Sequence, residues 1–394
     1  MGLILVLAVG SQLLASVLRI PALIVLLPAG FTAGALTDNV DPEKLLGSAF
    51  QPLVSLAVAL ILYDSGLGLQ WGKLRGRARR VAPRLVIWGV PVTFALTAVV
   101  AGPLLDMSAK AAVMTGAILV VSGPTVVGPL LAFIRPTDNV QRILSWEGSL
   151  IDPVGGVLGA VVFAEVTSSS RHGVGHALGQ LFLSIGIGVA GAVVGVAVLW
   201  FCLCKLKLDD VLRATVQLAC VVAVAAVCDI LHDDSGLTAA ILMGIAVANL
   251  PAFDMPTRRP LSETLVQLLI GILFVSISAT VTPESLHGLV LPTLGLVAFL
   301  VVVVRPFVVF GATIGTGLTS GERLFLSWMA PRGIVAAATA STFSAQLVSQ
   351  HIGGASKILP VTFLVIIATV ALYGLTGVPV ARRLGVTRPG PQPE

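Results

Sequence analysis

Apolar stretches of membrane-spanning length follow one another along almost the whole chain and leave only short polar connections between them. A helix that crosses a bilayer needs about 20 mostly apolar residues, so this pattern constrains the fold more than any single motif does. Charged residues make up 11% of the 394 residues, whereas a soluble domain carries about 25%. The chain is therefore not a soluble enzyme, a disordered protein or a nucleic-acid-binding module. An outer-membrane barrel is also excluded, because its alternating strands keep the composition near average.

We predict an all-α polytopic membrane protein with about thirteen transmembrane helices, of which the ninth is short. The predicted ranges are 2–18, 21–37, 46–69, 83–105, 109–134, 143–166, 177–204, 210–231, 236–250, 263–281, 286–314, 322–347 and 359–381. No connection is long enough to hold a soluble domain, so residues 1–381 are expected to form one integral membrane domain. The Pro-rich residues 382–394 are expected to form a short disordered cytoplasmic tail.

Lysine and arginine alternate between the connections as the positive-inside rule requires. If the N-terminus lies outside, the inner connections hold 18 of the 24 Lys and Arg residues and the outer ones hold four. The outer four are Lys44, Lys110, Arg171 and Lys357. This distribution predicts an outside N-terminus and a cytoplasmic C-terminus. The abundance of Ala, Val and Gly with little Lys favours the inner (plasma) membrane of a GC-rich bacterium.

Five charged residues are singled out within predicted spans, where a charge costs at least about 2.5–3.5 kcal/mol on insertion scales, whereas Asp229 and Glu165 lie near span ends and can reach water. The five are Asp64, Glu147, Asp152, Arg305 and Arg332. Asp64 lies near a span end and fits an interfacial carboxylate as well as a functional one. Arg305 precedes Pro306, and we interpret the two as a structural capping pair.

Glu147 and Asp152 are separated by five residues, which places them roughly 140° apart around a helix. They are therefore expected to have different roles. Arg332 is predicted to form a structural ion pair with Glu147, because an unpaired buried guanidinium would be costly. Asp152 lies mid-span without an obvious cation, and it is expected to be functional.

Three motifs within spans place proline beside small or polar residues. They are Ser122-Gly123-Pro124-Thr125, Asp152-Pro153 and Ala330-Pro331-Arg332. Each proline lacks an N–H and frees a carbonyl four residues back, so helix breaks are expected there, although a proline can also produce only a kink. Interrupted helices near the midplane are typical of secondary transporters. The interrupted fifth and twelfth spans are an odd number of helices apart, which fits an inverted-topology repeat.

These motifs together resemble a known family. WEGSLIDPVGG, around Asp152, resembles the sixth-helix motif of sodium/proton antiporters of the NhaP and NHE-like branch of the monovalent cation:proton antiporter superfamily. ALILYDSGLGL resembles the third helix of that branch, ILVVSGPTVVG its unwound fifth helix and WMAPRGIVAAA its twelfth-helix Arg-Gly motif. DDSGLTAAILMGIAVAN and VVVVRPF also have counterparts. The resemblance runs in order from about residue 5 to residue 381.

The resemblance implies an NhaA/NhaP-like fold with two inverted repeats, in a homodimer whose core domain moves against a dimerisation domain. It implies that Asp152 binds either an alkali cation or a proton, and that Glu147 and Arg332 form a stabilising pair. Asp64 becomes an auxiliary acid on the ion route. The candidate ligands beside Asp152 are freed carbonyls, water and the hydroxyls of Ser122, Thr125 and Ser149.

Two positions depart from the family pattern. Ile151 stands where the branch has Asn and its electrogenic relatives have Asp, and Gly123 replaces the Asp of the fifth helix. A site so poor in protein oxygens favours a larger, more easily dehydrated ion, which makes K⁺ a contender beside Na⁺ and Li⁺. Some relatives also carry a cytoplasmic regulatory domain after the last helix, so this chain is expected to be either minimal or truncated.

We hypothesise that the protein exchanges Na⁺ or K⁺ for H⁺ by alternating access, and that exchange is electroneutral because Asp152 carries either one proton or one cation. Two rivals stay open. A sodium-coupled symporter of a small organic anion would require a roomier polar site, and an ion channel would require a filter built from repeated residues. No P-loop or dinucleotide motif is present, so no nucleotide cofactor is expected. The low charge content argues against a nucleic-acid partner.

Overall fold

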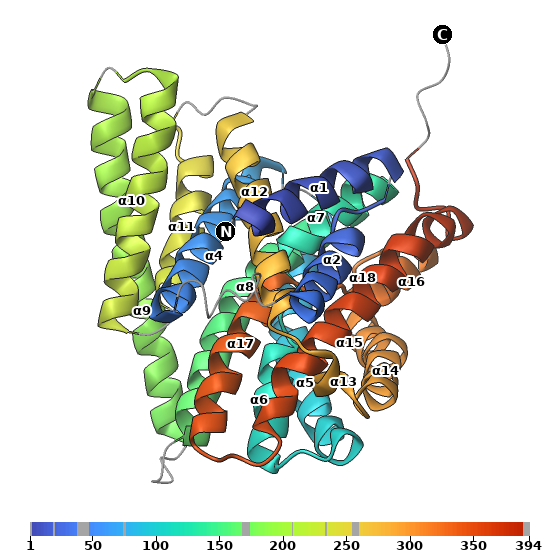
Figure 1. Ribbon diagram of the computed structural model, residues 1–394. Helices are drawn as coiled ribbons and strands as arrows, with labels where there is room; N and C mark the ends of the chain where they lie inside the picture. The colour runs from blue at the N-terminus through green and yellow to red at the C-terminus, as the bar shows by residue number, and fades with distance from the viewer. Residues whose placement is uncertain are drawn as a thin grey trace.

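The computed structural model describes residues 2–18, 20–37, 47–73, 76–167, 174–206, 208–232, 235–253 and 260–388. Within these ranges the regular structure is helical, apart from one antiparallel bridge between Pro136 and Thr387. The prediction of an all-helical chain is therefore confirmed for the described residues. Figure 1 shows long helices packed side by side, several of them tilted against one another.

The helices of the first half of the chain lie within or close to the first seven predicted ranges. They are α1 (Gly2–Leu18), α2 (Leu23–Leu36), α4 (Phe50–Leu67), α5 (Ala78–Leu105), α6 (Ala109–Ile118), α7 (Pro124–Ile134), α8 (Asp138–Thr167) and α9 (Val174–Trp200). A short 3₁₀ turn, η3 (Trp71–Lys73), follows α4, and a π-helical turn, η4 (Phe201–Lys205), continues α9.

The second half shows the same correspondence. Its helices are α10 (Asp210–Leu231), α11 (Ser235–Asn249), α12 (Pro260–Ala279), α13 (Pro283–Leu286), α14 (Val290–Phe299), α15 (Arg305–Ala312), α16 (Ser320–Trp328), α17 (Ile334–Ser349) and α18 (Ile358–Arg383). A π-helical turn, η5 (Leu300–Val304), joins α14 to α15.

Span length alone does not fix how many of these helices cross a bilayer. Within the described residues, six helices are long and apolar enough to do so, and seven shorter apolar helices have 10–17 residues. The count of thirteen crossings therefore stays a prediction.

The helices sort into two groups by their packing. One group, the core bundle, consists of α5–α8 and α14–α18. The other, the flanking bundle, consists of α1, α2, α4 and α9–α12. In Figure 1, α10, α11 and α4 of the flanking bundle lie at the left, and α18, α16, α15 and α14 of the core bundle lie at the right.

Glycines let helices of the flanking bundle approach closely. A Cβ on Gly66 of α4 would lie 2.5 Å from the carbonyl oxygen of Ile241, and a Cβ on Gly244 of α11 would lie 2.2 Å from that of Tyr63. Small residues at helix crossings are the usual means of close packing in membranes. These contacts fix α4 against α11 as one unit.

The segment after α18 is ordered further than expected. The predicted disordered tail begins at residue 382, but α18 runs to Arg383 and the next five residues pack on the connection between α7 and α8. The N–H of Thr137 donates to the carbonyl of Val386 (2.7 Å), and the N–H of Arg388 donates to that of Arg135 (3.1 Å). Backbone pairing and the burial of Val386 offset the entropy of ordering this segment. Residues 389–394 of the predicted tail lie outside the described residues.

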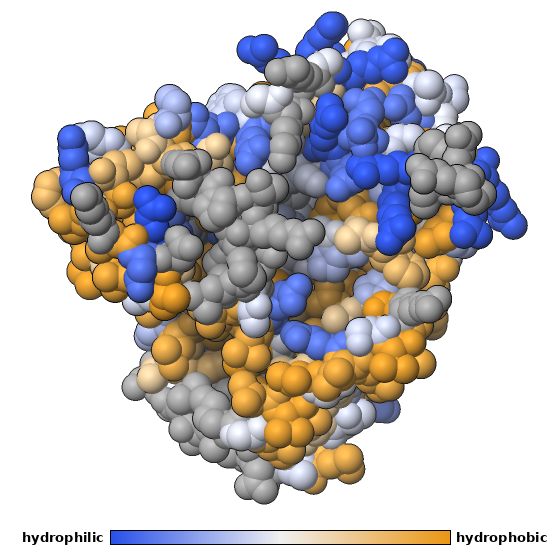
Figure 2. Space-filling view, turned by 90° about the horizontal axis from the view of Figure 1, so that it is seen from above, coloured by the Kyte–Doolittle hydropathy of each residue, from blue (hydrophilic) through white to orange (hydrophobic). Residues whose placement is uncertain are grey.

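Charged side chains gather at the end of the molecule where α18 ends. Figure 2, which views this end, shows hydrophilic side chains across the face and apolar residues along its flanks. Arg79, Arg80, Arg382 and Arg383 are exposed there. Several basic residues used to predict the topology lie outside the described residues, namely Arg19, Lys44, Arg75, Arg171, Lys207, Arg258 and Arg259.

Candidate functional site

Two helix interruptions meet inside the core bundle. Residues 119–123 separate α6 from α7, and residues 329–333 separate α16 from α17. A Cβ on Gly333 would lie 2.9 Å from the backbone nitrogen of Gly123 and 3.0 Å from its Cα, so the two breaks touch through their glycines. The crossing therefore has no room for a side chain at Gly333.

Proline sets the position of each break. Pro124 is the first residue of α7, where its missing N–H removes no helical hydrogen bond, and Gly123 before it is extended (φ −72°, ψ 150°). Pro331 follows Met329 and Ala330, and a residue before proline is disfavoured in the helical region. Ala330 is that residue, and α16 ends just before it, with the C-cap Met329 extended (φ −92°, ψ 107°).

The third predicted break is absent. Helix α8 runs from Asp138 to Thr167 without interruption, so the expectation of a break at Pro153 is wrong. The fixed φ of proline is compatible with a helix, so packing can hold the chain helical through Pro153 despite the lost hydrogen bond and the ring's clash with the carbonyl four residues before it. Gly148, earlier on the same helix, lies at a close contact: a Cβ there would lie 3.1 Å from the carbonyl oxygen of Ser122. α8 thus lies directly against the break between α6 and α7.

Asp152 is placed on α8 at this contact. Its side chain is 0% exposed, and neither carboxylate oxygen has a hydrogen-bond partner among the described residues. A Cβ on Gly123 would lie 2.9 and 3.1 Å from the two oxygens. A buried carboxylate without partners is costly when charged, so the site demands a bound proton or a bound cation.

Of the predicted oxygen ligands, Thr125 lies beside this carboxylate, since both approach the same face of Gly123. The Thr125 hydroxyl would lie 3.3 Å from a Cβ on Gly123, and it too is buried without a hydrogen-bond partner within the described residues. Ser149 is buried one turn before Asp152 on α8. Ser122 is buried in the break, where it lines a small cavity of about 20 Å³ that also touches Glu147 and Arg332. That cavity has room for about one water molecule.

Glu147 is paired with Arg305, not with Arg332 as predicted. The Arg305 guanidinium donates through Nη1 to Oε1 of Glu147 and through Nη2 to Oε2, the latter at 2.9 Å. Nε of Arg305 donates to the carbonyl of Leu326 (2.9 Å). Both side chains are buried, and each charge would be costly in the core without the other. The bidentate ion pair neutralises both charges.

The helical register of span eleven explains the missed partner. The N–H of Arg305 donates to the carbonyl of Leu300, a five-residue bond that belongs to η5. A π-turn adds a residue to the helix and rotates the residues after it, and Pro306 just after this turn is the sequence signal that could have revealed it.

Arg332 instead joins the two breaks. Its Nη1 donates to the carbonyl of Val120 (3.1 Å), a carbonyl that cannot accept a helical bond from Pro124. Its backbone N–H donates to the Thr369 hydroxyl (3.4 Å). The guanidinium thus lies at the C-terminal end of α6, where the helix dipole favours a cation.

Asp64 lies in a different place. It is half-buried two residues before Gly66, near the end of α4, and has an interaction partner of its own. It does not hydrogen-bond to Asp152, whose oxygens have no such partner among the described residues.

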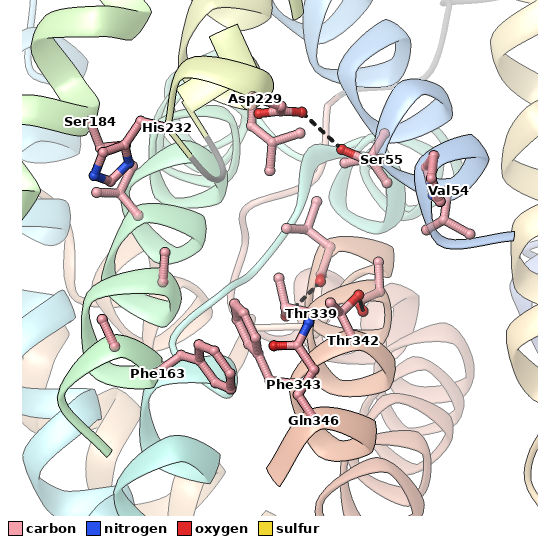
Figure 3. Close-up of a pocket in the computed structure, with 18 of the residues that line it drawn as sticks. Val54, Ser55, Phe163, Ser184, Asp229, His232, Thr339, Thr342, Phe343 and Gln346 are labelled. Atoms are coloured by element: carbon pink, nitrogen blue, oxygen red, sulfur yellow. Dashed lines mark hydrogen bonds between the residues drawn. The ribbon is translucent and has the colours of Figure 1, made fainter. Parts of the chain in front are cut away.

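A cavity of about 870 Å³ separates the two bundles on one side of the site. In Figure 3, Asp229 and Ser55 of the flanking bundle lie on one wall, joined by a hydrogen bond of 3.2 Å, and Thr339 and Thr342 of α17 lie on the facing one. Val157 of α8 also lines the cavity, one and a half turns beyond Asp152. The cavity approaches the carboxylate along α8 without exposing it.

Comparisons of sequence place the chain among cation exchangers. Residues 3–383 match the model of the sodium/hydrogen exchanger transmembrane family. The K(+)/H(+) antiporter NhaP of Alkalimonas amylolytica is 27% identical over 401 residues, an alignment that covers 98% of this chain and 67% of that protein. The K(+)/H(+) antiporter NhaP2 of Shewanella oneidensis is 26% identical over 342 residues, which cover 82% of this chain and 56% of that protein. The chain thus spans about half to two thirds of the length of these relatives.

Comparison of structures agrees on the fold. The sodium proton antiporter MjNhaP1 from Methanocaldococcus jannaschii, solved at pH 8, matches with a TM-score of 0.82 over 97% of each chain, at 21% identity. The resemblance inferred from the ordered motifs is therefore confirmed, and so is the antiporter fold. This chain is an integral membrane protein and belongs to the sodium/hydrogen exchanger family.

Proposed function

We propose that this protein is a secondary transporter that exchanges a monovalent alkali cation for a proton at Asp152. One observation carries the proposal: both carboxylate oxygens of Asp152 are buried and have no hydrogen-bond partner among the described residues. Such a group is stable when it holds either a proton or a cation. Since it cannot hold both, competition for one carboxylate couples the two fluxes and predicts electroneutral exchange.

One candidate oxygen ligand for an alkali cation, the Thr125 hydroxyl, lies beside this carboxylate. We infer that the Thr125 hydroxyl and the carbonyls of the break at 119–123 complete the shell, with water and with Ser122 and Ser149 as further ligands. Hard cations prefer such oxygen donors. Neither Ile151 nor Gly123 adds a second acid, so K⁺ is a candidate substrate beside Na⁺.

The two bundles provide the proposed route. Movement of the core bundle against the flanking bundle would expose Asp152 first to one side and then to the other. The cavity lined by Thr339 and Thr342 supports an approach from one side. Asp64, near the opposite end of α4, is the proposed auxiliary acid on the other.

We also propose the orientation and assembly. The alternation of basic residues supports an outside N-terminus and a cytoplasmic C-terminus in a bacterial inner membrane, which puts the large cavity on the outer side. The exposed apolar residues of α1 and α9, among them Val6, Leu13 and Val193, face lipid or the second copy of a homodimer.

The test uses purified protein in liposomes with an acidic interior and a pH-sensitive dye. Addition of Na⁺, K⁺ or Li⁺, but not choline, is expected to collapse the gradient in the wild type and not in Asp152→Asn. A Glu165→Gln variant, which removes an exposed acid at the far end of the same helix, is the matched control and should keep full activity. Cation-driven proton flux through folded Asp152→Asn would contradict the proposal.

A further inference from the structure

An aromatic contact joins the two bundles on the side of the site opposite the large cavity. Trp71, in η3 just after α4, lies edge-on to Trp146 of α8, with ring centroids 5.9 Å apart and an interplanar angle of 71°. The cavity is lined by the earlier part of α4, around Ser55, and by the later part of α8, around Val157. Along both helices, the two tryptophans therefore lie at the other end.

Trp71 is held firmly by the flanking bundle. Its backbone N–H donates to Oδ1 of Asn249 (2.6 Å), and Nδ2 of the same asparagine donates to the carbonyl of Leu69 (2.8 Å). Asn249 is the last residue of α11, the helix that meets α4 through Gly66 and Gly244. These hydrogen bonds hold the backbone of η3 against α11, while Trp71 itself is 61% exposed.

Trp146 belongs to the core bundle and to the site. It is only 6% exposed and immediately precedes Glu147, six residues before Asp152 on an uninterrupted helix. Any movement of the Asp152 region relative to the flanking bundle must therefore change the contact between Trp146 and Trp71.

We propose that Trp71 and Trp146 form the gate that closes the inner side of the ion site. The inference rests on the proposed exchange and deepens it, because it assigns to two residues the closure that alternating access requires. With the gate closed, the large cavity is the approach to the site. Separation of the two rings would admit ions from the opposite side. Edge-to-face aromatic pairs are only weakly attractive beyond their area burial, which suits a contact that must break in every cycle.

Another tryptophan provides the comparison within the same chain. Trp200, at the end of α9, is 42% exposed, and Lys205 lies 5.2 Å from its ring centroid. Both groups belong to the flanking bundle. If Trp71 only anchored the protein at the membrane boundary, its substitution should have the same effect on access to the site as substitution of Trp200. If Trp71 is part of a gate, the two effects should differ.

The first experiment locks the gate. In a background where Cys202, Cys204, Cys220 and Cys228 are replaced, Trp71→Cys and Trp146→Cys are joined with a short reducible bis-thiosulfonate, and exchange is measured in liposomes. We expect the cross-link to slow exchange at least tenfold and reduction to restore it. The control is a protein that keeps Cys202 and Cys220, on η4 and α10 of one bundle, where the same cross-linker should leave exchange unchanged. Full activity of a completely cross-linked Trp71–Trp146 pair would overturn the inference.

The second experiment does not depend on transport. Ser149→Cys, in the same cysteine-free background, is labelled from the inner side with a membrane-impermeant maleimide. Trp71→Ala should accelerate labelling at least fivefold, Trp71→Phe should restore slow labelling, and Trp200→Ala should have no effect. Equal labelling rates in Trp71→Ala and Trp200→Ala would refute the gate even if exchange itself were observed. Conversely, accelerated labelling without cation exchange would sink the proposed function alone.

Discussion

Glu147 and Asp152 lie five residues apart on one helix and expose 2% and 0% of their surface, yet their surroundings differ. Glu147 receives two hydrogen bonds from Arg305. Asp152 receives none from the described residues and lies against glycine and an unpaired threonine hydroxyl. Equal burial therefore does not imply an equal role. Glu147 is expected to contribute to the stability of the core bundle. Under the proposed exchange, Asp152, which has no hydrogen-bond partner among the described residues, binds a proton or a cation in turn.

The largest expected effect concerns the paired acid. Arg305→Gln leaves Glu147 buried without its cation, and breaking a buried pair costs about 3–5 kcal/mol. We expect a large fall in the thermal unfolding midpoint in detergent and a low yield of folded protein. The double variant Glu147→Gln/Arg305→Gln removes both charges and should recover most of the loss. A double variant as unstable as Arg305→Gln would show that the loss of stability does not come from an unpaired charge on Glu147.

The second prediction concerns cation binding at Asp152 when a methyl group is added at Gly123. Gly123→Ala places a Cβ within 3.1 Å of both Asp152 oxygens, so the carboxylate must shift. We expect the half-saturating cation concentration to rise at least tenfold while the protein stays folded. Gly128→Ala, in α7 just after the break and with nothing within 4 Å of the new Cβ, is the control. Equal affinities in the two variants would show that the Asp152–Gly123 contact does not shape the site.

A smaller effect is expected for the energetic coupling of Glu147 to Arg332 than to Arg305. Because Arg332 donates to the Val120 carbonyl and not to Glu147, its energetic coupling to Glu147 should be well below that of Arg305. A double-mutant cycle of Glu147→Gln with Arg332→Gln, read as unfolding midpoints, measures this coupling. A coupling as large as that between Glu147 and Arg305 would restore the pair predicted from the sequence.

The smallest expected effect is that of Thr125→Val. It removes a hydroxyl without a protein partner among the described residues, so stability should change by less than about 1 kcal/mol. If that hydroxyl is a cation ligand, the half-saturating cation concentration should rise two- to fivefold. Thr293→Val, which removes a similarly buried and unpartnered hydroxyl from α14, is the control for a purely structural effect. Identical cation affinities in the two variants would remove Thr125 from the shell.

Most of the helices could be predicted from the sequence. Of the two buried acids, the sequence predicted that Asp152 lacks a cation partner, but it did not predict the partner of Glu147. The lengths of the apolar stretches located the helices. Pro124 and Pro331 marked the two interruptions, because a proline disfavours the helical conformation of the residue before it. Pro153 was misjudged, since a proline inside a packed helix need not interrupt it. The partner of Glu147 was missed because a helical wheel carries no information about the π-turn before Arg305. Which of two buried arginines meets a carboxylate depends on tertiary packing that local patterns do not contain.

The single carboxylate beside Gly123 also has a consequence for the energy source. Under the proposed exchange, one positive charge enters for each that leaves, so a complete cycle moves no net charge through the membrane. The membrane voltage, worth about 2.3 kcal/mol per charge at 100 mV, would then neither drive nor oppose the exchange. Only the concentration gradients of the cation and the proton would set its direction, and the protein would run equally well in a depolarised cell.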